Sequence, residues 1–181
     1  MKRLVVTADD FGLVPEVNEA VEAAHRDGIL TAASLMVAEP AAADAVERAR
    51  RLATLRVGLH LVLVEGRPAL PPERVTDLVD GDGRFRTDMA RLGFDIFARP
   101  RVRRQLEAEI TAQFEAFAAT GLTLDHVNAH KHFHLHPTIA GTIISIGRRY
   151  GMTALRVPVE PRAVISQIER APLGLSWVTG P

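Results

Sequence analysis

Cysteine is absent from the 181 residues, and aromatic residues are scarce, with a single tryptophan and a single tyrosine. Without cysteine the chain has no disulfide framework, no thiolate metal site and no cysteine nucleophile, so nitrogen and oxygen atoms must bind any metal. Charge of neither sign is in excess, because lysine plus arginine and aspartate plus glutamate both number 22. This balance removes any bulk argument for nucleic acid, and we expect no nucleic-acid partner.

Long hydrophobic runs are missing as well. No stretch reaches the roughly 18 apolar residues of a transmembrane helix, and the start MKRLVVTADD has only a short apolar run before two acids, unlike a signal peptide. We therefore expect a cytoplasmic protein without an integral membrane segment. The hydrophobic fraction of 47% still supports a sizeable core, and the length favours one domain.

Short apolar runs alternate with amphipathic helical patterns along the chain. The predicted strands are 4–8, 29–37, 56–64, 122–128 and 154–157, and the predicted helices are 15–26, 40–52, 100–120 and 137–150. The alternation predicts a parallel α/β fold, either a barrel or an open sheet. A segment rich in proline, glycine and aspartate, 65–86, is typical of a lid or substrate wall, or else of a plain surface excursion.

Histidine is concentrated in one tract. Five of the seven histidines lie in HVNAHKHFHLHP, which begins at His126, and four of them alternate with other residues: His130, His132, His134 and His136. In an extended segment alternate side chains share one face. Imidazole is the commonest protein metal ligand, so the tract predicts a metal site, the alternative being a solvated polar loop.

Polar residues also occur at two other predicted strands. Asp9 and Asp10 follow the first strand, at the end where α/β folds place their chemistry, although turns and helix caps favour aspartate too. His60 is the one polar side chain in the apolar middle of the third strand, where a lone histidine is more often a satisfied core residue. Gly58 nearby permits close backbone approach.

The carboxyl ends of parallel strands meet at one edge of a sheet or one mouth of a barrel. We therefore expect the aspartates, His60 and the histidine tract to share a site, with one carboxylate and two imidazoles on a divalent metal. Such a set leaves positions open for water and substrate. The chemistry that it suits is metal-assisted hydrolysis, with a nearby carboxylate accepting a proton from water.

The motifs TADDFG, GLHLVL and HVNAHKHFHLHP, together with LTAASLMV and LRVP, resemble the YdjC/ChbG family of carbohydrate deacetylases. The resemblance runs from Met1 to about Pro161 and is nearest to the hopanoid-biosynthesis-associated branch, HpnK. It implies a distorted TIM-like (β/α) barrel that removes the acetyl group of an N-acetylated amino sugar. For this branch the implied substrate is a glycolipid, an N-acetylglucosamine-bearing hopanoid. Apolar residues that could support it, or equally belong to the core, are Phe94, Ile96 and Phe97.

The resemblance also implies roles for individual residues. The implied metal ligands are Asp10, His60 and His130. The implied catalytic residues are Asp9, His132, His134 and Arg156. Asp9 would be the general base, His132 and His134 would line the pocket, and Arg156 would orient an acid or bind substrate. The implied cofactor is Mg²⁺ or Zn²⁺, and two imidazoles favour Zn²⁺ on ligand softness.

Two features depart from the family pattern. Relatives often carry an acid in DSH where this chain has Asn128-Ala129-His130, and Asn128 can hydrogen-bond a ligand imidazole without supplying a second charge. A full (β/α)₈ barrel takes about 250 residues, whereas five strands are readable here. We expect a barrel truncated at its C-terminus, with the deacetylase portion in 1–161 and a tail of uncertain structure in 162–181. A second copy of the chain could cover the open edge.

Two other functions remain open at this stage. One is a metal- or sugar-binding homologue without turnover. The other is a different TIM-like metallohydrolase, such as a phosphoesterase, although Asp125 is the one additional carboxylate near the histidine tract and a two-metal site would need more.

Overall fold

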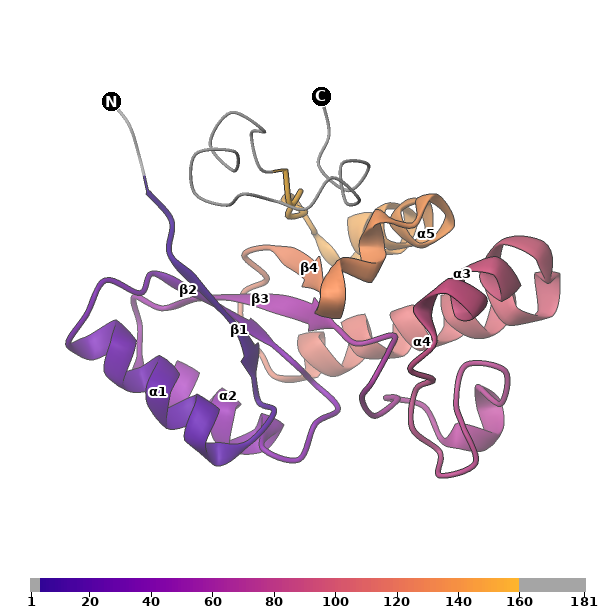
Figure 1. Ribbon diagram of the computed structural model, residues 1–181. Coiled ribbons are helices and arrows are strands. Elements are labelled where there is room, and N and C mark those ends of the chain that lie inside the picture. Colours follow the sequence, from indigo (N-terminus) through magenta and orange to yellow (C-terminus); the bar gives the residue numbers. More distant parts are fainter. Residues whose placement is uncertain (1–3, 160–181) are drawn as a thin grey trace, which may run out of the picture.

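Four parallel strands form the centre of the protein in the computed structural model, which describes residues 4–159. The strands lie in the order β1 (Thr7–Phe11), β2 (Ala32–Leu35), β3 (Arg56–Leu61) and β4 (Val127–Ala129). The α-helices are α1 (Pro15–Arg26), α2 (Ala42–Arg51), α3 (Met89–Ala98), α4 (Pro100–Ala119) and α5 (Pro137–Gly147). Short 3₁₀ segments are η1 (Pro72–Arg74), η2 (His130–Leu135) and η3 (Arg148–Tyr150). Strands and helices alternate (Figure 1), so the predicted parallel α/β class is confirmed.

The sheet is open over the part of the chain that the structure describes. In place of the predicted fifth strand, Leu155 makes a single parallel bridge to Val127 of β4. A closed barrel therefore stays a prediction, and the predicted tail, 162–181, lies outside the described residues. Within residues 4–159, none of the helices combines the length and the apolar character that a bilayer crossing requires.

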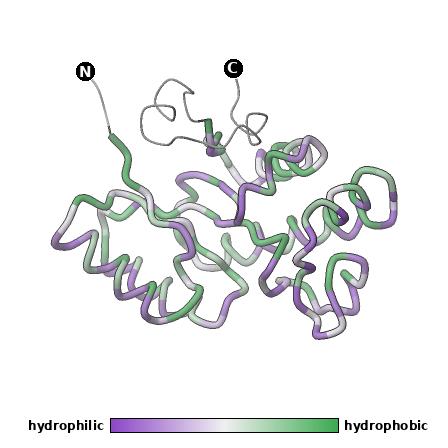
Figure 2. Tube along the Cα trace, viewed as in Figure 1, coloured by the Kyte–Doolittle hydropathy of each residue, from purple (hydrophilic) through white to green (hydrophobic). Residues whose placement is uncertain are grey.

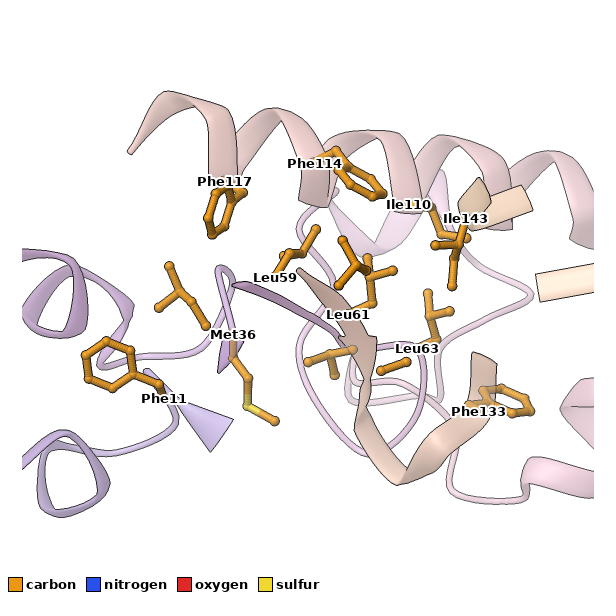
Figure 3. Packing of buried hydrophobic residues seen from close by; sticks show 14 of the residues in the cluster. Phe11, Met36, Leu59, Leu61, Leu63, Ile110, Phe114, Phe117, Phe133 and Ile143 are labelled. Carbon is orange, nitrogen blue, oxygen red and sulfur yellow. The ribbon is translucent and has the colours of Figure 1, made fainter. Parts of the chain in front are cut away.

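Alternation along the strands separates an apolar face of the sheet from a polar one. Leu59 and Leu61 of β3 are fully buried and face α4, where Ile110, Phe114 and Phe117 point toward the sheet (Figure 3). Along α1, hydrophobic and hydrophilic residues alternate (Figure 2), as expected of a helix with one buried side. The helices thus cover the apolar face of the sheet.

The opposite face of the sheet carries polar side chains in two adjacent rows. In the first row the strand register pairs Ser34 with Gly58, and in the second row it pairs His60 with Asn128. A glycine is required at position 58 because His126 approaches it closely. A Cβ atom there would lie 2.5 Å from the carbonyl oxygen of His126 and 2.6 Å from its ring. The predicted close backbone approach at Gly58 is confirmed.

The His126 ring, which fills the space beside Gly58, links one of these rows. Its Nε2 lies 2.9 Å from Oγ of Ser34, and its Nδ1 lies 3.1 Å from Oδ2 of Asp125. The connectivity is that of a serine–histidine–aspartate triad, but Ser34 is fully buried, so no substrate reaches its hydroxyl. Asp125 also accepts a hydrogen bond from Arg56, and the row therefore joins β2, β3 and the segment before β4.

Several element boundaries differ from the sequence-based prediction. The first strand begins at Thr7 rather than Leu4, because Leu4 and Val5 are exposed and the ladder starts where Thr7 pairs with Ala32. The strand continues through Phe11, so the two aspartates belong to it rather than to a following turn. The other strands are shorter than predicted: β2 keeps only the centre of its predicted range, β3 ends at Leu61, and β4 begins at Val127 and ends one residue later than predicted.

The sequence pattern did not predict helix α3. Asp88 begins it by accepting a hydrogen bond from the backbone N–H of Arg91, and Leu92 and Ile96 are fully buried. Of the three apolar residues noted in this segment, Ile96 belongs to the core, whereas Phe94 and Phe97 are 67% and 64% exposed. Apolar residues thus lie on two sides of this helix, and no single periodic pattern results.

The segment predicted to be a lid or surface excursion, 65–86, is packed into the protein. Val75, Leu78 and Phe85 are buried, and Val79 and Phe85 form an antiparallel bridge. These buried side chains anchor the segment to the protein, while most of its other residues are exposed or half-buried, and a role as lid or substrate wall stays a prediction.

Two buried polar side chains of α4 hold the segment that leads from β3. Glu109 accepts hydrogen bonds from the backbone N–H groups of Ala69 (2.7 Å) and Leu70 (3.0 Å). Gln113 bonds both the N–H and the carbonyl of Val62, at 3.0 and 2.7 Å. Burial raises the pKa of the Glu109 carboxyl, while these hydrogen bonds oppose the rise. The segment is therefore fixed by its backbone, largely independently of its side chains.

Replacing Gly58 by alanine should destabilise the protein by about 1–3 kcal/mol or more, because the added methyl group overlaps His126. The matched control is Gly141→Ala in α5, where no atom lies within 4 Å of the added Cβ. It should raise the free energy of unfolding by up to about 1 kcal/mol through helix propensity. Urea denaturation measures both, and equal effects of the two changes would contradict the packing argument.

Candidate metal centre

Three side chains from the ends of three strands meet at one edge of the sheet. Oδ1 of Asp10 lies 3.2 Å from Nε2 of His60 and 3.2 Å from Nδ1 of His130. The two ring nitrogens are 3.4 Å apart. The three residues predicted as metal ligands are thus brought together, each offering one donor atom to a common point.

The spacing of these donors fits a divalent ion. A tetrahedral ion bound at about 2.0–2.1 Å separates neighbouring donors by about 3.3–3.4 Å, close to the three distances between Asp10, His60 and His130. The His60 side chain is 3% exposed, whereas that of Asp10 is 36% exposed, so the group is closed on the sheet side and open toward solvent. Three protein ligands with one open side are typical of catalytic metal sites.

A β-bulge in β1 brings two successive aspartates to the site. Ala8 pairs with Ala33 and Phe11 with Leu35, so three steps on β1 match two steps on β2. Asp10 adopts the left-handed conformation, with φ 61°. In a regular strand neighbouring side chains point to opposite faces. The extra residue lets both carboxylates reach the polar groups, and Phe11 returns to the core.

The histidine tract is not extended, and the prediction that its four alternating imidazoles share one face is wrong. After β4 the chain turns into η2, in which Lys131 and His132 have φ angles of 52° and 55°. The turn buries Phe133 and leads directly into α5. Of the tract's histidines, only His130 reaches the donor group, while the His132 side chain is exposed and His134 is buried.

Backbone strain is concentrated around this site. Within residues 4–159, positive φ angles at non-glycine positions occur at Asp10, Glu65, Lys131 and His132. All four follow or end strands that carry a donor residue. The Glu65 carboxylate pairs with the Lys131 ammonium and so links the segment after β3 to the turn after β4. Such conformations cost free energy and tend to cluster at functional sites.

A row of hydrogen bonds fixes the orientation of His60. Arg156 donates to Oδ2 of Asp9 at 2.7 Å, and the Asn128 amide nitrogen donates to Oδ1 of Asp9 at 2.8 Å. The amide oxygen of Asn128 therefore faces Nδ1 of His60, at 2.7 Å. Because an amide oxygen only accepts, Nδ1 carries a hydrogen. Nε2, which faces Asp10 and His130, is therefore the nitrogen of His60 that would bind a metal.

Both aspartates are ionised at neutral pH. Burial raises the pKa of the Asp9 carboxyl, but the hydrogen bonds from Arg156 and Asn128 and the electrostatic effect of His60 outweigh it, so this pKa lies below its usual range. Hydrogen bonds from His130 and His60 hold the pKa of the Asp10 carboxyl well below its usual range. A metal ligand and a proton acceptor both require this charged form.

Backbone contacts place Arg156 beside Asp9. The N–H of Arg156 donates to the Val127 carbonyl of β4, at 2.9 Å. The carbonyl of Arg156 accepts a hydrogen bond from Nε2 of His134, at 2.9 Å. Burial lowers the pKa of the His134 imidazole, so the ring is neutral at neutral pH and its one hydrogen serves this contact. His134 thus acts on Arg156 and does not contact the donor group.

Comparison with known proteins finds a matching family model and relatives of similar sequence. Residues 3–178 match the family model described as YdjC-like protein, beyond the Pro161 limit of the motif resemblance. A carbohydrate deacetylase from Brevibacillus brevis is 41% identical over 157 residues, which are 87% of this chain and 58% of that protein. A carbohydrate deacetylase from Vibrio vulnificus (strain CMCP6) is 38% identical over 152 residues, 82% of this chain and 56% of that protein.

A solved structure shares the fold. It is a protein from Enterococcus faecalis V583, described as a proposed cellobiose-phosphate cleavage protein, with a TM-score of 0.75 and 30% identity. The similarity covers 93% of this chain and 64% of that one. The chain thus spans less than two thirds of the length of each of these relatives.

Removing any one donor should abolish tight metal binding. We expect Asp10→Asn, His60→Ala and His130→Ala each to lower the affinity for Zn²⁺ by at least about 100-fold, more than the loss of an outer partner costs. His132→Ala is the matched control from the same tract, and its affinity should stay unchanged because its side chain is exposed. Calorimetric titration of the metal-free protein measures these affinities. Loss of binding in His132→Ala alone would contradict the assignment.

The row behind His60 should matter for metal affinity as well. Asn128→Leu keeps the branching and the number of side-chain heavy atoms but leaves Nδ1 of His60 without an acceptor, and we expect an affinity loss of about 10–100-fold. Ser34→Ala changes the neighbouring row, which does not touch the donors, and should leave the affinity unchanged. Competition with a chelating dye resolves the difference. An unaltered affinity in Asn128→Leu would show that the row does not orient the ligand.

Proposed function

The chain belongs to the YdjC-like protein family, and we propose that it is a metal-dependent carbohydrate deacetylase that hydrolyses the N-acetyl group of an amino sugar. The observation that carries the proposal is the group Asp10, His60 and His130, with the ionised Asp9 beside it. The relatives named carbohydrate deacetylase support the reaction. A donor group with an open side supports a hydrolytic metal.

The bound metal would polarise the acetamide carbonyl and lower the pKa of a water molecule. Asp10, His60 and His130 would hold it. Two imidazoles and one carboxylate favour Zn²⁺ or a similar transition ion over Mg²⁺, which prefers oxygen ligands. The donor spacing agrees with a tetrahedral ion of this kind.

We assign Asp9 the role of proton acceptor. Each of its oxygens accepts one hydrogen bond, from Asn128 or Arg156, and the side chain is 35% exposed, so lone pairs remain for water. Arg156 keeps the carboxylate charged and oriented. Arg156 also makes the Asp9 carboxylate a weaker base, since basicity falls with pKa. The contact with Arg156 therefore lowers the proton affinity of Asp9 and fixes the position of its carboxylate.

The two remaining predicted catalytic residues take different roles. His134 is a positioning residue, because its hydrogen bond holds the Arg156 backbone. His132 lies exposed on the same turn as His130 and is free to contact the sugar.

The finer points of the proposal concern the whole protein. We infer that the polar face of the sheet is the inner face of a distorted (β/α) barrel, of which residues 1–161 form a part. An N-acetylglucosamine-bearing hopanoid is our candidate substrate in the HpnK branch, and the exposed Phe94 and Phe97 agree with an apolar group near the sugar. We place the activity in the cytoplasm. A second copy of the chain is a candidate partner at the open sheet edge.

Acetate release from N-acetylglucosamine-type substrates tests the function. The metal-free protein should be inactive, and Zn²⁺, Mn²⁺, Co²⁺ or Mg²⁺ should restore activity to differing degrees. Asp9→Asn should retain metal and lose about 10²–10⁴-fold in rate, the usual contribution of a general base. Asp125→Asn is the matched control on the neighbouring row and should retain both.

Three outcomes would change the proposal. Full activity in Asp9→Asn and His60→Ala would refute it. Metal binding without acetate release from any substrate would favour a binding homologue without turnover. Phosphate release from phosphorylated substrates would favour a phosphoesterase.

A further inference from the structure

The exposed phenylalanines of α3 are exceptional in this protein. Of the seven phenylalanines, five are at most 5% exposed: Phe11, Phe85, Phe114, Phe117 and Phe133. The other two, Phe94 and Phe97, are 67% and 64% exposed. They are three residues apart, so they lie on the same side of α3, opposite the buried Leu92 and Ile96. α3 therefore has an apolar outer side as well as an apolar inner one.

Positive charge surrounds this outer side. Residues 86–104 contain six arginines and two aspartates, a local net charge of +4 in a chain whose net charge is zero. Asp95 is buried and shared between Arg86 and Arg99. The Arg99 side chain is 64% exposed and that of Arg101 is 69% exposed. Arg101 pairs with Asp77 at 2.9 Å, and Arg103 donates to the carbonyl of Phe97 at 2.8 Å. The segment that carries the two aromatic rings is thus rich in arginine.

α3 also lies against the turn that carries a metal ligand. At Gly93, a Cβ atom would be 3.3 Å from the ring of His136 and 3.8 Å from that of Phe133. Leu135, in the turn that begins at His130, is 51% exposed. The buried side of α3 therefore packs against the turn that begins at His130. Figure 1 shows α3 and α4 side by side, away from α1 and α2.

We propose that the outer side of α3, formed by Phe94 and Phe97 with Arg91 and Arg99, docks on an anionic membrane surface. Aromatic side chains enter the boundary between headgroups and acyl chains, while arginines attract anionic lipid. Because the whole chain is neutral, attraction to such a surface depends on this local charge.

Charge complementarity selects this occupant over a second copy of the chain. A symmetric contact between two α3 surfaces would oppose like charges across the interface. An anionic bilayer instead supplies both an apolar layer and negative charge. The proposal does not depend on the deacetylase activity.

Vesicle flotation with the full chain tests this proposal, using phosphatidylcholine vesicles with and without phosphatidylglycerol. The protein should float with the anionic vesicles, and salt should weaken the association. The double variant Phe94→Ser, Phe97→Ser should bind at least about tenfold more weakly, because it lacks the two rings that docking would bury in the membrane. Arg91→Glu should weaken binding to anionic vesicles specifically.

Two controls separate this surface from folding and from catalysis. Ile29→Ser changes another exposed apolar residue, 74% exposed and far along the chain, and should bind vesicles like the wild type. Asp10→Asn should also bind vesicles normally while losing metal. Equal binding to both vesicle types, no binding, or normal binding by the double variant would overturn the proposal. So would self-association of the protein that the double variant abolishes, which would assign the surface to a second copy.

Discussion

The bulge in β1 is the feature on which the rest of the site depends. A regular strand would send Asp9 and Asp10 to opposite faces of the sheet. With one extra residue, Asp10 faces His60 and His130, while Asp9 faces Asn128. The left-handed conformation of Asp10 costs of the order of 1–3 kcal/mol. The hydrogen bonds that its carboxylate accepts from the two imidazoles offset this strain.

Asn128 shows how a neutral residue serves where the family resemblance led us to expect an acid. Its amide both accepts from His60 and donates to Asp9, which a carboxylate could not do. A third carboxylate beside Asp9 and Asp10 would also add repulsion. The asparagine thus fixes the orientation of the His60 ring and holds the ionised Asp9 in one arrangement, with Arg156 as the balancing charge.

Much of the fold follows from local pattern, and the exceptions have physical causes. α1 was predicted with its observed bounds, since a proline, an apolar stripe and a glycine mark its ends and inner side. α3 was missed, because its apolar residues occupy two sides and no single periodicity results. Glu109 and Gln113 lie on the apolar side of α4, and their position among buried residues was a signal that these polar groups have buried partners.

The sequence by itself determined which groups are available: two aspartates at the end of one strand, His60 in the next-but-one, and His130 after β4. Parallel strands align their carboxyl ends, so chain order alone brings these residues together. Only the tertiary structure decided which imidazoles take part, because the direction of each histidine depends on the φ angles after Ala129, and burial of Phe133 forces that turn. Long-range packing, which no local pattern contains, selects this conformation.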